Sequence, residues 1–136
     1  MTFHYFDSSA LTKLLLGEVE SEALAAWVVE HGGLERIISC DLAHTEVRRT
    51  LHRLGGDEVD LSFAERMLDM VVHVRLVDDL FVDAGNLAPE TALRSLDALH
   101  TVAALKMGSA VDWFVTYDKQ QAECAARAGL NVASPS

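Results

Sequence analysis

Cysteine is scarce in this 136-residue sequence. The two cysteines, Cys40 and Cys124, lie far apart, and neither belongs to a CxxC motif. Free, packed thiols in a cytosolic protein are the simplest interpretation, and a single disulfide between the two is the alternative. The six histidines do not form a zinc-type cluster in the sequence either.

The sequence also lacks any apolar run that approaches the length of a membrane span. Its N-terminus has no basic region followed by a long apolar stretch, so we expect no secretory signal, no membrane contact and a cytoplasmic location. Half of the residues are hydrophobic, which is enough for a globular core. No linker, internal repeat or low-complexity segment divides the chain, and we expect one domain over residues 1–136.

Basic residues are outnumbered, with 11 Lys and Arg against 21 Asp and Glu and a net charge of −10. Because basic patches supply most of the affinity for nucleic acids, this balance argues against a nucleic-acid binder. However, carboxylates gathered around a cation are partly neutralised, and the basic residues can be concentrated on one face. Net charge therefore leaves the functional class open.

Strands and helices are predicted to alternate along the chain. Buried strands are expected at 3–7, 36–40, 74–77 and 113–117, with a short fifth strand at 130–132. Helices are expected at about 8–16, 21–31, 41–54, 62–72, 80–87, 93–106 and 119–127, with Ser8 or Ser9, Ser62 and Ser95 as caps. This alternation implies βαβ units, and hence an α/β fold with a parallel sheet and right-handed crossovers.

Four acidic residues are predicted to lie at one edge of this sheet. Asp7 and Asp118 end strands, and Glu46 and Asp97 lie near the starts of helices. These positions share an edge in a parallel sheet, where ligands bind, so the four carboxylates can converge. Each also has an ordinary alternative as a helix cap, a helix-dipole partner or a solvated helix residue.

The surroundings of Asp97 favour the functional interpretation. Its helix is apolar enough to be buried, and a buried acid costs free energy unless a cation or donors meet it. A site made only of oxygen ligands suits a hard cation such as Mg²⁺ or Mn²⁺. His100, one turn beyond Asp97, is a candidate helper, with a packed structural histidine as the alternative.

Basic residues follow Glu46 on nearly the same stripe of its helix. Arg49 and Arg53, three and seven positions further on, are candidate phosphate ligands at the edge of the cleft. A solvated face is the ordinary alternative. Lys13 and Arg94 are further candidate phosphate contacts, because they lie near the acidic positions in the sequence.

Taken together, these segments resemble the PIN-domain ribonucleases, specifically the VapC-type toxins of toxin–antitoxin pairs. The resemblance spans nearly the whole chain. It is carried in order by Tyr5-Phe-Asp7-Ser-Ser-Ala-Leu, Glu46-Val-Arg-Arg, Leu93-Arg-Ser-Leu-Asp97-Ala-Leu-His, Phe114-Val-Thr-Tyr-Asp118 and the closing segment 125–135.

The resemblance implies a three-layer α/β/α sandwich with strand order 3-2-1-4-5. It also implies a homodimer and a small antitoxin that places a basic side chain in the acidic site. DNA would be reached only indirectly, through the antitoxin. The family's acidic quartet corresponds to Asp7, Glu46, Asp97 and Asp118, and Thr116 matches a polar position beside it.

The resulting hypothesis is metal-dependent hydrolysis of RNA. Asp7, Asp97 and Asp118 would hold one or two Mg²⁺ or Mn²⁺ ions and Glu46 would complete the site, which would be locally strained without metal. Substrate contacts are expected from Arg49, Arg53, Thr116 and Lys13. One alternative is a catalytically inactive PIN-like protein-binding domain. The other is a flavodoxin-like phospho-acceptor, although that class has a pair of acids after the first strand.

Overall fold

The computed structural model describes residues 2–136, within which five parallel strands form one sheet. The strand order is β3-β2-β1-β4-β5, as the resemblance implied. β1 (Phe3–Phe6) is the central strand and pairs with β2 (Ile37–Cys40) and β4 (Val111–Val115). β3 (Val72–Val74) and β5 (Val132–Ala133) form the two edges. The residue that follows β1 therefore lies at the middle of the sheet.

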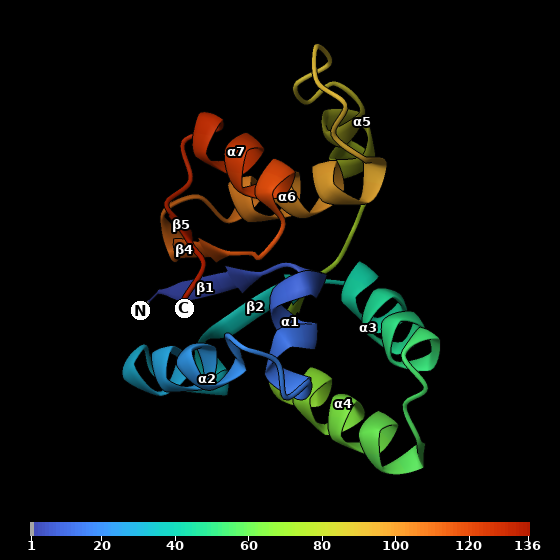
Figure 1. The fold of residues 1–136 in the computed structure, drawn as a ribbon. Coiled ribbons are helices and arrows are strands. Elements are labelled where there is room, and N and C mark those ends of the chain that lie inside the picture. Colours follow the sequence, from blue (N-terminus) through green and yellow to red (C-terminus); the bar gives the residue numbers. More distant parts are fainter. Residues whose placement is uncertain (1) are drawn as a thin grey trace.

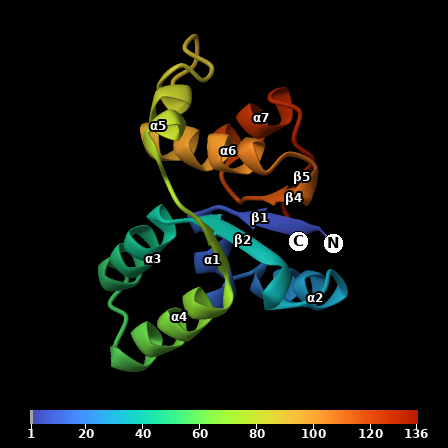
Figure 2. The same cartoon turned by 180° about the vertical axis from the view of Figure 1, so that it is seen from behind.

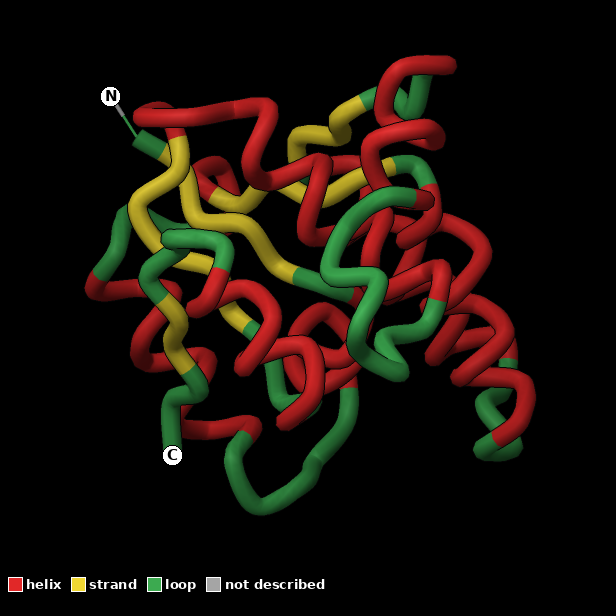
Figure 3. Tube along the Cα trace, turned by 90° about the horizontal axis from the view of Figure 1, so that it is seen from above, coloured by secondary structure: helices red, strands yellow, loops and turns green. Residues whose placement is uncertain are grey.

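Helices cover both faces of the sheet and complete a three-layer sandwich (Figures 1 and 2). One face carries α1 (Ser8–Leu15), α2 (Ser21–Glu30), α3 (Leu42–Arg53) and α4 (Glu58–Met70). The other carries α5 (Asp78–Gly85), α6 (Ser95–Met107) and α7 (Lys119–Arg127). Two short 3-10 helices, η1 (Leu34–Arg36) and η2 (Gly108–Ala110), lead into β2 and β4. In Figure 3 the strands, in yellow, lie together with the helices, in red, around them.

The central strand supplies one aromatic side chain to each half of the core. Tyr5 packs on the α6 and α7 side with Phe114, and Phe6 packs on the α1 to α4 side with Leu11 and Val47. Neighbouring strand residues point to opposite faces, and both aromatic side chains are fully buried. Burying each one contributes on the order of 2–3 kcal/mol, so β1 is held firmly from both sides.

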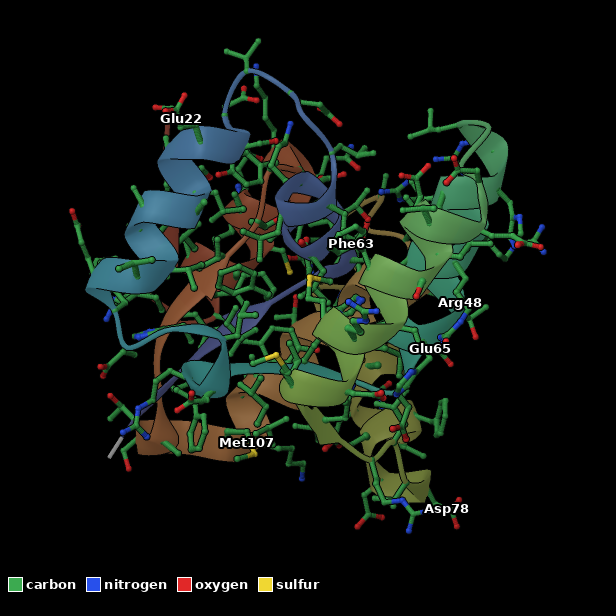
Figure 4. The ribbon with its side chains drawn as sticks, turned by 90° about the horizontal axis from the view of Figure 1, so that it is seen from below. Glu22, Arg48, Phe63, Glu65, Asp78 and Met107 are labelled. Carbon is green, nitrogen blue, oxygen red and sulfur yellow. The ribbon has the colours of Figure 1, made fainter. Side chains whose placement is uncertain are left out.

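The start of α4 differs from the prediction. Asp57, not Ser62, caps this helix: its Oδ1 accepts the Asp60 backbone N–H, and Asp60 Oδ2 accepts the Asp57 backbone N–H, both at 3.0 Å. The Ser62–Glu65 pattern lies inside the helix, so its interpretation as a capping box was wrong. Near the middles of α3 and α4, Arg48 Nη2 lies 3.9 Å from Glu65 Oε1 (Figure 4).

Other predicted boundaries are shifted by one to several residues. β3 occupies Val72–Val74 rather than 74–77, and β4 occupies Val111–Val115 rather than 113–117. The predicted limits followed apolar residues, which extend beyond the residues that pair. In the structure, β3 is defined by its pairing with β2, in which Ile38 aligns with Val72. Ser95 is not the cap of α6, since Arg94 occupies that position without a capping side-chain bond.

The structure bears on two predictions, one about cysteine pairing and one about membrane spans. Cys40 and Cys124 are both free and buried, so the disulfide alternative was wrong. Within residues 2–136, no helix has the combination of length and apolarity needed to cross a membrane.

Candidate active site

A cavity of about 360 Å³ lies at the carboxyl edge of the sheet and is lined by all four predicted acids. Asp7 directly follows β1, and Asp118 caps α7 after β4. Glu46 comes from α3, and Asp97 lies in the first turn of α6. The remaining lining residues are polar or charged: Ser8, Ser9, Thr12, Lys13, Glu18, Thr50, Arg53, Arg94, His100 and Tyr117.

Asp7 is both a helix cap and a cavity residue. Its Oδ1 accepts the Ala10 backbone N–H at 3.0 Å and the Ser9 hydroxyl at 2.6 Å, and its Oδ2 accepts the Thr116 hydroxyl at 2.5 Å. Burial raises the pKa of Asp7, while the nearby His100 charge and these hydrogen bonds oppose the rise. The capping interpretation and the functional interpretation are therefore compatible at this position.

Glu46 forms a partly buried ion pair with His100. Glu46 Oε1 lies 2.8 Å from His100 Nε2 and accepts the Ser8 hydroxyl at 2.7 Å, while His100 Nδ1 lies 2.8 Å from the Tyr5 hydroxyl. Burial lowers the pKa of His100, but its hydrogen bonds with Cys40 and Glu46 outweigh burial and raise that pKa to about 10. Burial also disfavours the charged form of Glu46, yet the His100 hydrogen bond and charge bring its pKa below the usual range.

Arg94 bridges the other two acids. Its Nε lies 3.0 Å from Asp97 Oδ2, and its Nη2 lies 3.0 Å from Asp118 Oδ2. The sequence predicted Arg94 as a phosphate contact, and the structure places it inside the cavity as a shared counter-ion. The sequence predicted strain from repulsion among four acids without metal. That prediction did not consider the Arg94 guanidinium and the His100 imidazolium, which lie against three of them.

The four predicted substrate residues lie at different distances from the cavity. Lys13 and Arg53 line it, although the Lys13 ammonium also pairs with Glu18 at 2.8 Å and Glu20 at 3.0 Å. Thr116 is fully buried and does not line the cavity, but its hydroxyl donates to Asp7 and accepts the Asp118 backbone N–H at 3.1 Å.

Arg49 is exposed and is absent from the lining of the cavity, so the structure does not bring it to the site. Helix geometry explains the difference between the two arginines of α3. Three residues rotate a side chain about 60° away from Glu46, whereas the seven residues to Arg53 rotate it only about 20°.

Sequence reasoning missed the hydroxyl groups that hold the acids. Ser8 and Ser9 were interpreted as helix caps, but their hydroxyls donate to Glu46 and Asp7. Their position directly after the strand-ending acid was the available signal. Tyr5 gave no such signal, because an aromatic residue in a buried strand is ordinary core composition.

The donor chemistry of the cavity fits a hard divalent cation. Its four carboxylates offer only oxygen ligands, which Mg²⁺ and Mn²⁺ prefer. As the side chains of residues 2–136 stand, however, no three His, Cys, Asp or Glu groups are arranged to hold a metal ion. The guanidinium of Arg94 lies between Asp97 and Asp118 and is largely exposed, so its rotation would free both carboxylates to face the cavity.

The fold and the site together define a parallel α/β sandwich whose carboxyl edge collects acids around a cavity. The strand order differs from the 2-1-3-4-5 order of flavodoxin-like proteins, so the phospho-acceptor alternative is wrong in its fold. The PIN domain family profile matches residues 4–127. The chain belongs to the PIN domain family, which confirms the resemblance inferred from the sequence.

Curated relatives match over nearly their full length. The chain is 34% identical to Ribonuclease VapC47 of Mycobacterium tuberculosis (strain CDC 1551 / Oshkosh) over 132 residues, 96% of each chain. It is 36% identical to Ribonuclease VapC46 of Mycobacterium tuberculosis (strain ATCC 25618 / H37Rv) over 134 residues, 97% of each.

A solved structure shares the fold. The crystal structure of Mycobacterium tuberculosis VapC20, described as a Sarcin-Ricin loop cleaving toxin, superposes with a TM-score of 0.74. The alignment covers 96% of this chain and 98% of VapC20 at 17% sequence identity. At that level of identity the likeness establishes the architecture alone.

Proposed function

We propose that this chain is a divalent-metal-dependent endoribonuclease, formed as one domain over residues 1–136, that hydrolyses RNA phosphodiester bonds. It acts as the toxin of a type II toxin–antitoxin pair. The observation that carries the proposal is the convergence of Asp7, Glu46, Asp97 and Asp118 on one cavity. The full-length relatives named as VapC ribonucleases support the same activity.

The acids divide into ligands and a supporting group. Asp7, Asp97 and Asp118 would hold Mg²⁺ or Mn²⁺, and Glu46 completes the site. A bound ion of this kind lowers the pKa of a water molecule and neutralises charge on phosphoryl oxygens. The chain itself fixes Asp7 through Ser9 and Thr116, which leaves this ligand little rotational freedom.

Positive charge at the cavity answers the objection raised by the net charge of −10. Arg53 and Arg94 line the cavity, and both can meet the phosphates of an RNA strand once it enters. Lys13 adds a third cation, which is partly neutralised by Glu18 and Glu20. The acidic surface elsewhere does not oppose binding at this edge directly, because salt screens charges over about 10 Å.

The partners follow from the same proposal. The substrate is RNA, and the inhibitor is a cognate antitoxin whose basic side chain competes for the acidic cavity. The chain forms a homodimer in the cytoplasm, and it contacts operator DNA only through the antitoxin. Co-purification of the chain with a small basic-tailed partner encoded beside it would test this part.

The decisive experiment compares wild type with Asp7→Asn, with Mn²⁺ supplied to both. We expect the variant to lose RNA cleavage by at least about 100-fold, because it loses a charged ligand at the centre of the sheet edge. Asp69→Asn, an exposed change on α4, is the matched control and should cleave normally. Circular dichroism should show both variants folded.

Two results would overturn the proposal. Full activity of wild type in excess EDTA would remove the metal requirement, and unchanged cleavage by Asp7→Asn would remove the acidic site. Calorimetry addresses the inactive protein-binding alternative: absence of Mn²⁺ binding at millimolar concentration, together with absence of cleavage by wild type, would favour it.

A further inference from the structure

His100 is the most enclosed ionisable side chain at the cavity, with a relative exposure of 1%. Although it belongs to α6, its ring meets side chains from other elements. Nδ1 faces Tyr5 of β1 at 2.8 Å and Cys40 of β2 at 3.5 Å. Nε2 faces Glu46 of α3 at 2.8 Å and Ser8 of α1 at 3.2 Å.

We propose that His100 is a positioning residue for the proposed reaction: it fixes the carboxylate of Glu46 by holding Oε1 and anchors that carboxylate to Tyr5 of the central strand. The inference rests on the proposed function, because it assigns a role within the same site.

The anchor is rigid at its far end. Tyr5 is fully buried, its ring stacks on Phe114 at a centroid distance of 5.2 Å, and its strand pairs on both sides. A buried tyrosine needs a partner for its hydroxyl, and His100 Nδ1 is that partner. The imidazole therefore cannot turn without breaking a bond to the middle of the sheet.

The hydrogen bonds from Tyr5 through His100 end at one oxygen of Glu46. Both hydrogen bonds that join Glu46 to Ser8 and His100 involve Oε1. A protonated imidazole donates from both nitrogens, so Nδ1–H is directed to Tyr5 and Nε2–H to Glu46. Within the described residues, Oε2 is the oxygen that these two donors leave available to the cavity.

Packing alone does not require this arrangement. A core histidine that only fills space is neutral and needs a single partner, whereas His100 is buried against a carboxylate and has an oxygen within hydrogen-bond distance of each ring nitrogen. A salt bridge of this kind contributes little to stability once desolvation is counted, yet it fixes geometry. Fixed geometry matters at a catalytic site, where a displacement of about 1 Å can cost on the order of 100-fold in rate.

A double-mutant cycle tests the inference. We expect His100→Gln to lower kcat for RNA cleavage by about tenfold while KM changes by less than about twofold, because only the geometry of Glu46 is lost. Glu46→Gln should lower kcat by about 100-fold. If His100 acts through Glu46, adding His100→Gln to Glu46→Gln should cost nothing further.

Tyr5→Phe is the second variant and covers the case in which His100→Gln fails to fold. It keeps the stacked ring and removes only the hydroxyl that anchors Nδ1, so kcat should fall by about threefold. This loss should also vanish in the Glu46→Gln background. Mn²⁺ affinity, measured by calorimetry on the protein with metal alone, should be no weaker in the double variant than in Glu46→Gln alone.

The outcomes separate the two proposals. A wild-type chain that neither binds Mn²⁺ nor cleaves RNA refutes the proposed function. An active wild type in which the His100 and Glu46 losses multiply refutes the positioning role, since independent effects are additive in free energy. An active His100→Gln with unchanged kcat refutes it as well.

Discussion

At the scale of single residues, the cavity places each acid against a donor or a cation. Asp7, 4% exposed, would be costly to bury charged without the three donors that meet its oxygens. Asp97 and Asp118 share Arg94, and Glu46 has His100. The cavity therefore contains its own cations before any ligand arrives.

The sequence was sufficient to place the acids but not their partners. Asp7 and Asp118 were predictable because a strand end in a parallel sheet is a position that can be counted along the chain. The Tyr5–His100 bond joins residues 95 positions apart, and no local pattern specifies such a pair. The bridge from Arg94 to Asp118 likewise depends on how α6 packs beside α7.

The Glu46–His100 pair predicts a specific pH dependence of stability. The pKa of His100 rises from 6.5 to about 10 on folding, so its stabilisation is complete below about pH 6.5 and is lost as the pH rises through about 10. The pKa of Glu46 is lowered from 4.5, so its stabilisation is present above about pH 4.5 and is lost as the pH falls.

We therefore expect the free energy of unfolding of wild type, relative to His100→Gln, to be largest near about pH 5.5 and to shrink towards about pH 10. Tyr5, Ser8, Cys40 and the charge of Asp7 face the same ring and are present in both proteins, so the difference isolates His100. Urea unfolding across that range measures it. A difference that is constant with pH would contradict an ionised pair.

At the scale of elements, the types of helix and strand were predictable, whereas several of their limits were not. Apolar periodicity identified the α-helices and the strands, because burial imposes it, but the two 3-10 helices, η1 and η2, were not predicted. Caps depend on which side chain reaches the first free N–H groups, and here the two candidate caps, Asp57 and Ser62, lie more than one turn apart. Asp57 rather than Ser62 is the cap because Asp57 and Asp60 each accept the backbone N–H of the other. This reciprocal pair starts α4 about one turn earlier than predicted.

This cap yields a prediction with a matched control. Asp57→Ala should lower Tm by about 3 °C, because the Asp60 backbone N–H at the start of α4 loses the carboxylate that accepts it. Ser62→Ala, at the position that the sequence favoured as a cap, should leave Tm within about 1 °C, since this serine is exposed inside the helix. Differential scanning calorimetry of both variants decides between the two caps. A larger loss for Ser62→Ala would restore the sequence prediction.

At the scale of the whole molecule, the excess of acidic residues affects how the two helical layers pack together beside the cavity. The α1 to α4 layer and the α5 to α7 layer lie on opposite faces of the sheet (Figure 1). The cavity is lined by acids from both layers, Glu46 of α3 on one side and Asp97 of α6 on the other. In a chain with a net charge of −10, cations at that meeting place reduce repulsion between the layers.

Arg94 tests this balance from both directions. Removing its guanidinium with Arg94→Gln leaves Asp97 and Asp118 unpaired, so Tm in EDTA should fall by about 2 °C. The same change removes a positive charge from the place between two proposed ligands, so Mn²⁺ should bind about fivefold more tightly. Arg53→Gln is the matched control, because Arg53 lines the cavity without pairing to either acid within the described residues.

Calorimetric titration with Mn²⁺ and thermal scans with and without EDTA measure both effects. A shared counter-ion is distinguished by a lower Tm together with a higher Mn²⁺ affinity in the variant. Removal of an ordinary surface residue would leave both Tm and Mn²⁺ affinity unchanged or lower both. If Arg94→Gln binds Mn²⁺ no more tightly than wild type, the guanidinium does not occupy the place that a metal ion takes. Asp97 and Asp118 would then meet the metal by a route that leaves their bridge to Arg94 intact.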